Sequence, residues 1–103
     1  MISISGYQFE GPYTKTDSFK ENAGIYAILT RGHANVPWTV LDIGESDQVK
    51  SRIGNHDRKD CWNLNNQGTL AAAVLYTPGW TATQRRNLES SLRQQYTPTC
   101  GVI

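Results

Sequence analysis

The sequence predicts an α/β fold of the α+β type, in which helices flank a three-stranded antiparallel sheet and an extra N-terminal strand precedes it. Two runs rich in β-branched and aromatic residues, 24–30 and 38–43, are joined by a Gly- and Pro-containing connector of hairpin length. A third apolar run follows at 69–76, and apolar residues in 81–96 recur with the period of a helix. A chain of 103 residues forms a single domain, 1–103, so bifunctional proteins are excluded.

The extra strand is predicted from the first residues of the chain. Ile2 and Ile4 alternate with serines and lead to Tyr7 and Phe9, which is the period of a half-buried strand. Residues 11–22 contain Gly, Pro and mainly polar side chains, and this composition predicts a loop.

A short amphipathic helix is predicted over 46–56. Val49 and Ile53 recur one turn apart after a serine that can cap the first turn. The opposite face carries Lys50 and Arg52. The polar segment that follows has room for a helical turn around its cysteine and tryptophan, before the third apolar run begins.

The clearest helix is predicted over 81–96. Thr81 and Gln84 match a capping box, apolar residues repeat every four positions from Leu88, and Pro98 stops the continuation.

Glu89 borders the apolar stripe of this helix. Arg85 and Arg93 lie one turn before and one turn after it. Taken alone, the pattern is explained by two weak surface ion pairs.

Charge is almost balanced over the chain, with 10 Lys and Arg against 9 Asp and Glu. The net charge of +1 excludes a protein that coats nucleic acid by charge alone, but it allows a local basic site. Residues 1–47 carry three basic and six acidic residues, whereas 48–103 carry seven and three. No Walker, GxGxxG, HExxH or GxSxG pattern occurs, so nucleotide hydrolysis, hydride transfer, zinc proteolysis and lipase chemistry have no support.

Cys61 and Cys100 form no CxxC motif and have no second pair with which to bind zinc. We expect both thiols to be reduced in a soluble, cytoplasmic protein. His56 lies five residues before Cys61, but no third group is apparent that would orient a Cys–His nucleophile. No apolar stretch approaches the length of a membrane span and no leader pattern opens the chain, so no membrane partner is expected.

Two triplets, Gly24-Ile25-Tyr26 and Asp42-Ile43-Gly44, resemble the two halves of the GIY-YIG nuclease signature. The residues that follow have the order of that family: Arg52 comes ten residues after Asp42, His56 four residues later, and Glu89 on a helix after an intervening strand. The predicted order of strands and helices is also that of the family's core.

The resemblance covers about residues 19–101 and implies a metal-dependent DNA endonuclease that hydrolyses phosphodiester bonds with Mg²⁺ or Mn²⁺. It implies that Tyr26 and His56 prepare the attacking water, that Arg52 stabilises the phosphate, and that Glu89 binds the metal.

Elementary chemistry suits these roles. One carboxylate at Glu89 can hold Mg²⁺ while water and phosphate fill the other positions, and the Arg52 guanidinium offers a bidentate fork to a phosphate. On one helix, Arg52 and His56 would reach the same cleft. Tyr26 is a general base only if positive charge lowers its pKa from about 10. The ordinary alternatives are a core-edge tyrosine, a helix C-terminal histidine and a solvated arginine.

Asp42 stands where the family has tyrosine, and Glu45 where some members have lysine. Both place negative charge where a phosphate is expected; at 4 Å this costs roughly 4 kcal/mol at an effective dielectric near 20, or about 1 kcal/mol in water. Cys100 and Gly101 replace an asparagine that the family often has.

Two interpretations of Asp42 therefore stay open. In the first, Asp42 joins Glu89 as a second metal ligand or takes the role of the base. In the second, the fold persists as a catalytically silent nucleic-acid-binding or protein-interaction domain.

DNA is the expected partner. The candidate contacts to its backbone are the basic residues Lys50, Arg52, Arg58, Lys59, Arg85 and Arg86. Trp38, Trp62 and Trp80 can stack on unpaired bases, although core positions also explain them. The chain shows no targeting module, so specificity would need a homodimer or a targeting partner protein.

Overall fold

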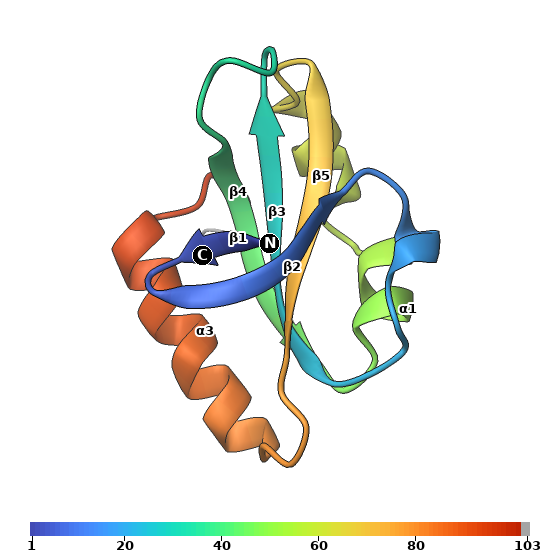
Figure 1. The fold of residues 1–103 in the computed structure, drawn as a ribbon, viewed down its shortest axis with the longest axis vertical. Coiled ribbons are helices and arrows are strands. Elements are labelled where there is room, and N and C mark those ends of the chain that lie inside the picture. The colour runs from blue at the N-terminus through green and yellow to red at the C-terminus, as the bar shows by residue number, and fades with distance from the viewer. Residues whose placement is uncertain (102–103) are drawn as a thin grey trace.

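The computed structural model describes residues 1–101 and has five antiparallel strands in the order β1-β2-β5-β3-β4 (Figure 1). The strands are β1 (Ile2–Ile4), β2 (Tyr7–Tyr13), β3 (Gly24–Arg31), β4 (Thr39–Ser46) and β5 (Thr69–Tyr76). The helices are a 3₁₀ turn, η1 (Thr16–Ser18), and α1 (Val49–Gly54), α2 (Lys59–Leu64) and α3 (Ala82–Tyr96).

The α+β class and the three strands β3, β4 and β5 are confirmed, but three strands are too few for the sheet. The extra N-terminal strand is a hairpin of β1 and β2, closed at Ser5 and Gly6, which both have positive φ. Strand β2 continues to Tyr13, into the predicted loop, and pairs with β5 at Glu10 and Tyr13.

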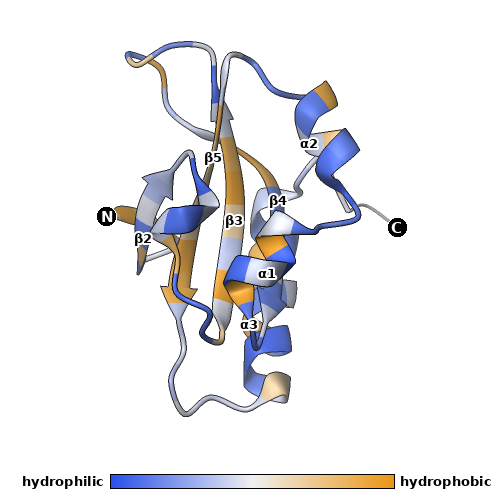
Figure 2. Cartoon of the chain, turned by 90° about the vertical axis from the view of Figure 1, so that its right-hand side faces the viewer, coloured by the Kyte–Doolittle hydropathy of each residue, from blue (hydrophilic) through white to orange (hydrophobic). Residues whose placement is uncertain are grey.

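Strand β3 is buried on both faces, so its side chains alternate between two apolar cores. Tyr26 and Ile28 lie in the core that α1 and α2 cover, and Ile25 and Leu29 lie in the core that α3 covers. Figure 1 shows α1 and α3 on opposite sides of the sheet, and Figure 2 shows the mainly hydrophobic colour of β3 between its neighbours. This arrangement explains why β3 reads as a continuous apolar run.

The predicted helix over 81–96 is confirmed, with its capping box, and the segment with room for a helical turn around Cys61 and Trp62 forms α2. The predicted helix over 46–56 is too long, because α1 ends at Gly54. Asn55 leaves the helical conformation at φ −122°, and its amide donates to the carbonyl of Ser51. His56 therefore lies beyond the helix that carries Arg52, which corrects the prediction of one shared helix.

A disulfide joins Cys61 on α2 to Cys100, which follows α3, with 5.9 Å between the Cα atoms. The prediction of two reduced thiols is wrong, because the fold brings together cysteines 39 positions apart in the sequence. The Cys100 amide also donates to the Leu41 carbonyl at 2.8 Å, which covers part of the edge of β4. Within residues 1–101, no helix is long and apolar enough to span a membrane.

Candidate active site

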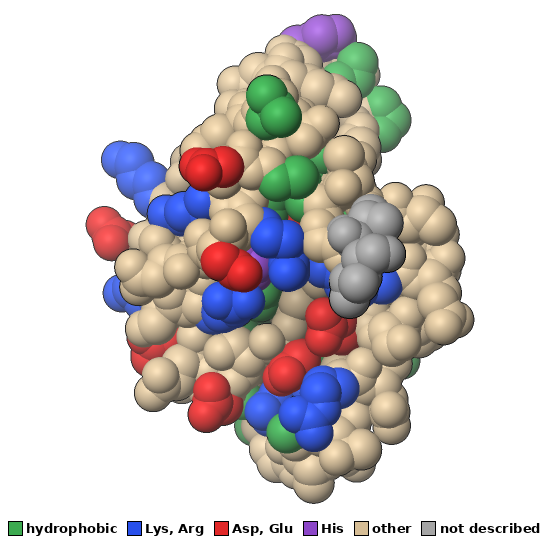
Figure 3. Space-filling model, turned by 180° about the vertical axis from the view of Figure 1, so that it is seen from behind, with side chains coloured by type: hydrophobic (Ala, Val, Ile, Leu, Met, Phe, Trp, Pro, Cys, Tyr) green, Lys and Arg blue, Asp and Glu red, His purple; other side chains and the backbone are tan. Residues whose placement is uncertain are grey.

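The predicted site residues gather around β4, the last strand of the sheet. Tyr26 projects from β3 and Asp42 from β4 into the core below α1 and α2, while Glu89 comes from α3 on the opposite face. Because no strand lies beyond β4, side chains from both faces can meet around its edge. Figure 3 shows basic and acidic side chains gathered around a hollow on one face of the molecule.

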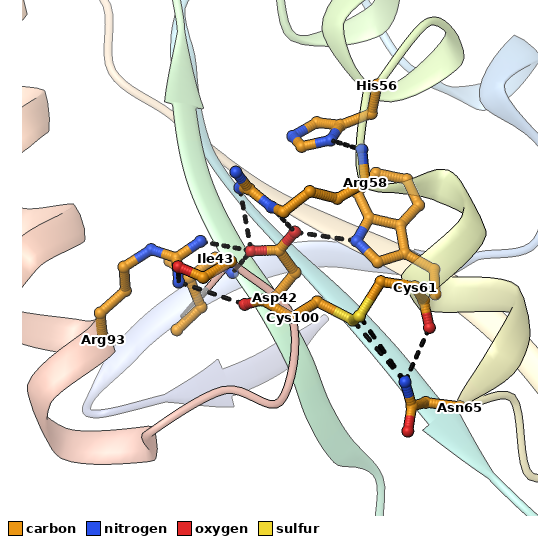
Figure 4. The surroundings of a disulfide bond; sticks show 10 residues. Asp42, Ile43, His56, Arg58, Cys61, Asn65, Arg93 and Cys100 are labelled. Atoms are coloured by element: carbon orange, nitrogen blue, oxygen red, sulfur yellow. Dashed lines mark hydrogen bonds and ion pairs between the residues drawn. A yellow bond between two sulfur atoms is a disulfide. The ribbon is translucent and has the colours of Figure 1, made fainter. Parts of the chain in front are cut away.

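Tyr26 and His56 form a buried hydrogen-bonded pair. The Tyr26 Oη lies 2.6 Å from His56 Nε2, and the two residues are 1% and 4% exposed. The Arg58 backbone N–H donates to His56 Nδ1 at 3.0 Å (Figure 4), so Nδ1 is unprotonated and Nε2 carries the proton donated to Tyr26 Oη. Burial, together with the charges of Arg52 and Arg58, lowers the pKa of His56 to about 4, so the imidazole is neutral at pH 7.

Gly44 makes room for the Tyr26 ring. The two residues are cross-strand partners in β3 and β4, and a Cβ at Gly44 would overlap the Tyr26 hydroxyl. Burial raises the pKa of Tyr26 to about 12, while the nearby charges of Arg52 and Arg58 act in the opposite direction. The hydroxyl is therefore protonated in the free protein at neutral pH.

Arg52 reaches this site from α1. Its Nη2 lies 3.1 Å from Asp57 Oδ1, and its side chain is 39% exposed. Asp57 Oδ1 also lies 3.3 Å from His56 Nδ1, but both atoms are acceptors when the imidazole is neutral, so Arg52 and His56 are neighbours of one carboxylate that binds only Arg52. Exposed ion pairs are weak, which leaves the Arg52 fork free to exchange Asp57 for a phosphate.

Asp42 is completely buried and surrounded by donors (Figure 4). Its carboxylate accepts from Arg58 Nε at 2.7 Å and Arg58 Nη2 at 3.1 Å, from Trp62 Nε1 at 2.8 Å, from the Ile43 backbone at 2.9 Å, and from Arg93 Nη2. An ionised carboxylate has about four lone-pair sites, so these donors saturate it. Two guanidinium groups share the Asp42 carboxylate, and Arg93 also pairs with Glu89, so two positive and two negative charges meet here.

The sequence did not predict that Arg58, Trp62 and Arg93 bind Asp42. Arg93 was noted only as a neighbour of Glu89, and Trp62 only as a core or stacking residue. Arg58 was predicted to contact DNA, but its Nε and Nη2 atoms bind Asp42. No local spacing signals this cluster, because its members come from β4, α3 and the beginning of α2.

Glu45 is also paired within the protein. Its Oε2 accepts from Arg85 Nε at 2.9 Å, and Arg85 is itself buried. The repulsion expected between a phosphate and this carboxylate is therefore offset by a guanidinium. Arg85 faces Glu45 and the Trp80 carbonyl instead of solvent, whereas Arg86 and Lys59 are exposed and Lys50 is half-buried.

Of the two predicted metal ligands, Glu89 has more carboxylate lone pairs free to bind a metal than Asp42 has. It accepts a single long hydrogen bond, from Arg93 Nε at 3.4 Å. Burial raises its pKa, and the neighbouring Arg93 acts in the opposite direction. Among residues 1–101 no group of three or more His, Cys, Asp or Glu side chains could hold a metal ion. A lone carboxylate still fits Mg²⁺, which keeps several waters, whereas the saturated Asp42 carboxylate does not fit.

The chain matches no protein-family model, no curated protein and no solved structure. The resemblance to GIY-YIG nucleases therefore rests on the sequence alone, on the two triplets and the residues that follow them.

The C-terminal segment closes one side of the site. The Cys100 and Gly101 carbonyls accept from Arg93 Nη1 at 3.3 and 3.5 Å. Gly101 has φ +78°, and a Cβ there would come within 2.7 Å of Arg93 Nη2 and 2.9 Å of Arg58 Nε. Backbone carbonyls thus accept hydrogen bonds from Arg93 at the place where the family often has an asparagine.

Proposed function

We propose that this protein is a divalent-metal-dependent endonuclease that hydrolyses DNA phosphodiester bonds at the edge of β4, where side chains from the α1 and α3 sides of the sheet meet. The observation that carries the proposal is the hydrogen bond of 2.6 Å between Tyr26 and His56, beside the exposed guanidinium of Arg52. A hydroxyl held by a neutral imidazole and a cation able to bind phosphate are two of the parts that phosphodiester hydrolysis needs.

His56 positions Tyr26 in this proposal. Its Nε2–H occupies one lone pair of the hydroxyl, so the Tyr26 proton points elsewhere and can orient a water molecule. Because the pKa of Tyr26 is about 12, Tyr26 can remove a proton from that water only as a phenolate, after its own proton has passed to solvent, and forming the phenolate requires added positive charge. Arg52 and Arg58 lower the pKa in the required direction.

Glu89 is the residue that would hold the metal, and Arg52 the residue that would bind the phosphate. A bound Mg²⁺ or Mn²⁺ would polarise a phosphoryl oxygen and lower the pKa of a coordinated water. Asp42 acts as an anchor, because its carboxylate fixes Arg58 and Arg93 beside the site. The proposal therefore assigns Asp42 neither to the metal nor to the base.

DNA is the proposed partner. Lys50, Lys59 and Arg86 supply further phosphate contacts around the site, each of which would make binding weaker at high salt. A homodimer or a targeting partner protein remains a prediction for specificity. The cytoplasmic location also remains a prediction, and the Cys61–Cys100 disulfide favours an oxidising compartment instead.

A cleavage assay tests the proposal. Supercoiled, branched and single-stranded DNA are incubated with the oxidised protein in Mg²⁺, in Mn²⁺ and in a chelator. Arg52→Gln should lower the rate roughly 10²- to 10³-fold and Tyr26→Phe by a similar factor. Arg31→Gln is the matched control, because Arg31 lies over the Trp38 ring, 4.1 Å from its centroid, at the far end of β3. Absence of cleavage of every substrate, or equal rates in all variants, would overturn the proposal.

A second candidate is the catalytically silent nucleic-acid-binding domain. The burial of both Tyr26 and His56 favours it, because an attacking water must reach a hydroxyl that is 1% exposed. This function predicts DNA binding that does not depend on metal, with no product after long incubation. DNA binding measured in a chelator, alongside the cleavage assay, separates the two functions.

A further inference from the structure

A cavity of about 240 Å³ opens on the α1 and α2 side of the sheet, away from β4. Its floor is apolar and comes from β3, α1 and β5, through Ile28, Ile53 and Leu70. Its outer wall is formed by the end of β2 and the η1 turn, which the sequence predicted as a loop. None of the proposed catalytic residues lines this cavity.

Aromatic rings form two of the walls. Tyr13 and Phe19 meet edge to face, with 5.3 Å between the ring centroids. Trp62 on α2 also lines the cavity, but it is only 3% exposed, and its ring centroid lies 4.6 Å from that of His56. A flat apolar group in the cavity would contact the exposed part of the Tyr13 ring, on which every nucleobase can stack because every base has a π face.

The rim is basic and polar. Lys15 and Lys59 line it together with the hydroxyls of Thr14 and Thr16 and the amide of Asn63. No acidic residue is among the described residues that line the cavity, and neither lysine forms an ion pair with a described carboxylate. The rim therefore favours an anion whose apolar part enters the cavity.

We propose that this cavity binds one nucleotide, with the base on the exposed Tyr13 ring and the phosphate at Lys15 and Lys59. Its volume is below the roughly 300–1,000 Å³ of pockets for drug-sized ligands, which limits the occupant to one ring system. The Asn63 amide offers both a donor and an acceptor to the edge of a base. The same chemistry serves a free mononucleotide or an unpaired nucleotide at the end of a DNA strand.

Trp62 connects this cavity to the candidate active site. One edge of its indole donates to Asp42, its ring contacts His56, and the same side chain lines the cavity. Occupancy should therefore change the fluorescence of Trp62. Binding does not require cleavage, so this inference stands or fails separately from the proposed endonuclease.

The test is a titration of the full-length oxidised protein, followed by calorimetry and by the fluorescence of a Trp38→Phe/Trp80→Phe variant. The probes are a 5′-mononucleotide, the matching nucleoside, inorganic phosphate, and a DNA duplex with and without a single-stranded overhang. We expect saturable binding of the mononucleotide, about tenfold weaker binding of the nucleoside, and no saturation by phosphate. Tighter binding of the overhang than of the mononucleotide would identify a strand end as the occupant, and the reverse would identify a free nucleotide.

Matched variants locate the site. Tyr13→Leu should weaken mononucleotide binding by about tenfold or more, whereas Tyr7→Leu, at the other exposed end of β2, should not. Lys15→Gln should weaken it, whereas Lys20→Gln should not, because Lys20 does not line the cavity. Equal affinities in each pair, or no saturable binding, would overturn the inference.

Binding must also be separated from cleavage. Glu89→Gln should abolish metal-dependent cleavage but leave mononucleotide affinity unchanged, since Glu89 does not line the cavity. Loss of nucleotide affinity in this variant would place the nucleotide at the candidate active site and contradict the assignment to the cavity.

Discussion

Replacement of Asp42 by asparagine should strongly destabilise the fold. The carboxylate is completely buried and accepts hydrogen bonds from Arg58, Arg93 and Trp62. An asparagine has nearly the same shape, but it removes the charge that neutralises two guanidinium groups and turns an NH₂ group toward other donors. Breaking a buried ion pair from one side costs about 3–5 kcal/mol, which is a large share of the 5–15 kcal/mol that stabilises a typical domain.

Urea unfolding under oxidising conditions measures this loss. Asp57→Asn is the matched control, since Asp57 also pairs with an arginine but its side chain is 73% exposed. The control should leave the free energy of unfolding nearly unchanged. If Asp42→Asn loses no more stability than Asp57→Asn, the interpretation of Asp42 as a buried anchor is refuted.

Asp42→Tyr, which restores the residue of the GIY-YIG signature, extends the same reasoning. A tyrosine ring at this fully buried position would have to displace the Arg58 and Trp62 side chains that now contact the carboxylate. We expect lower stability than in Asp42→Asn and no gain in DNA cleavage. A stable Asp42→Tyr variant that cleaves faster than the wild type would contradict this account.

The remaining predictions concern the histidine, two glycines and the disulfide. The pKa of His56 is lowered from 6.5 to about 4, so below pH 6.5 the unfolded chain binds a proton that the folded protein excludes. Stability should fall by at most about 3 kcal/mol between pH 6.5 and 4, as measured by urea unfolding, and an NMR titration midpoint near 6.5 would contradict it. Gly44→Ala should lower the free energy of unfolding by about 1–3 kcal/mol, because the new Cβ would overlap Tyr26 Oη. Gly54→Ala is the control: Gly54 has open space around it, so the variant should be as stable as the wild type or slightly more stable. Equal effects of the two substitutions in thermal unfolding would refute this prediction. Reduction of Cys61–Cys100, which are 39 residues apart, should cost about 4 kcal/mol by chain entropy, and unchanged unfolding in reductant would oppose that estimate.

Much of the fold follows from local pattern. Strands β3, β4 and β5 and helix α3 were predictable because burial of β3 on both faces, the hairpin connector and the capping box at Thr81 leave direct marks in the sequence. The β1–β2 hairpin was read as one strand because its turn occupies only Ser5 and Gly6. The end of α1 at Gly54 was missed because the apolar repeat of Val49 and Ile53 does not show where the helix stops.

The candidate site was predictable only in part. Arg52 and His56 were expected together on one helix, and both lie beside Asp57, although His56 lies beyond the end of α1. The spacing of residues in the sequence could not predict that Arg58 and Arg93 neutralise Asp42, because the two arginines lie 16 and 51 residues away from it. Folding around the edge of β4 brings them together.

The disulfide and the cavity could not be predicted from the sequence for the same reason, because residues far apart in the chain form them. Cys61 and Cys100 become neighbours only when α2 and the C-terminal segment meet beside β4. The cavity needs β2 to continue past Gly11 so that Tyr13 lines it together with Phe19. Both features depend on tertiary packing and leave no local pattern.

The most direct test of the proposed hydrolysis is the single-turnover rate of plasmid cleavage in Mg²⁺, compared between the wild type and Glu89→Gln. Glutamine keeps the length of the side chain and the packing on α3 but removes the charge that would hold the metal. We predict cleavage by the wild type and a loss of about 10²-fold or more in Glu89→Gln, with the fold intact. Equal rates in the two proteins, or no cleavage by the wild type, would contradict the central claim.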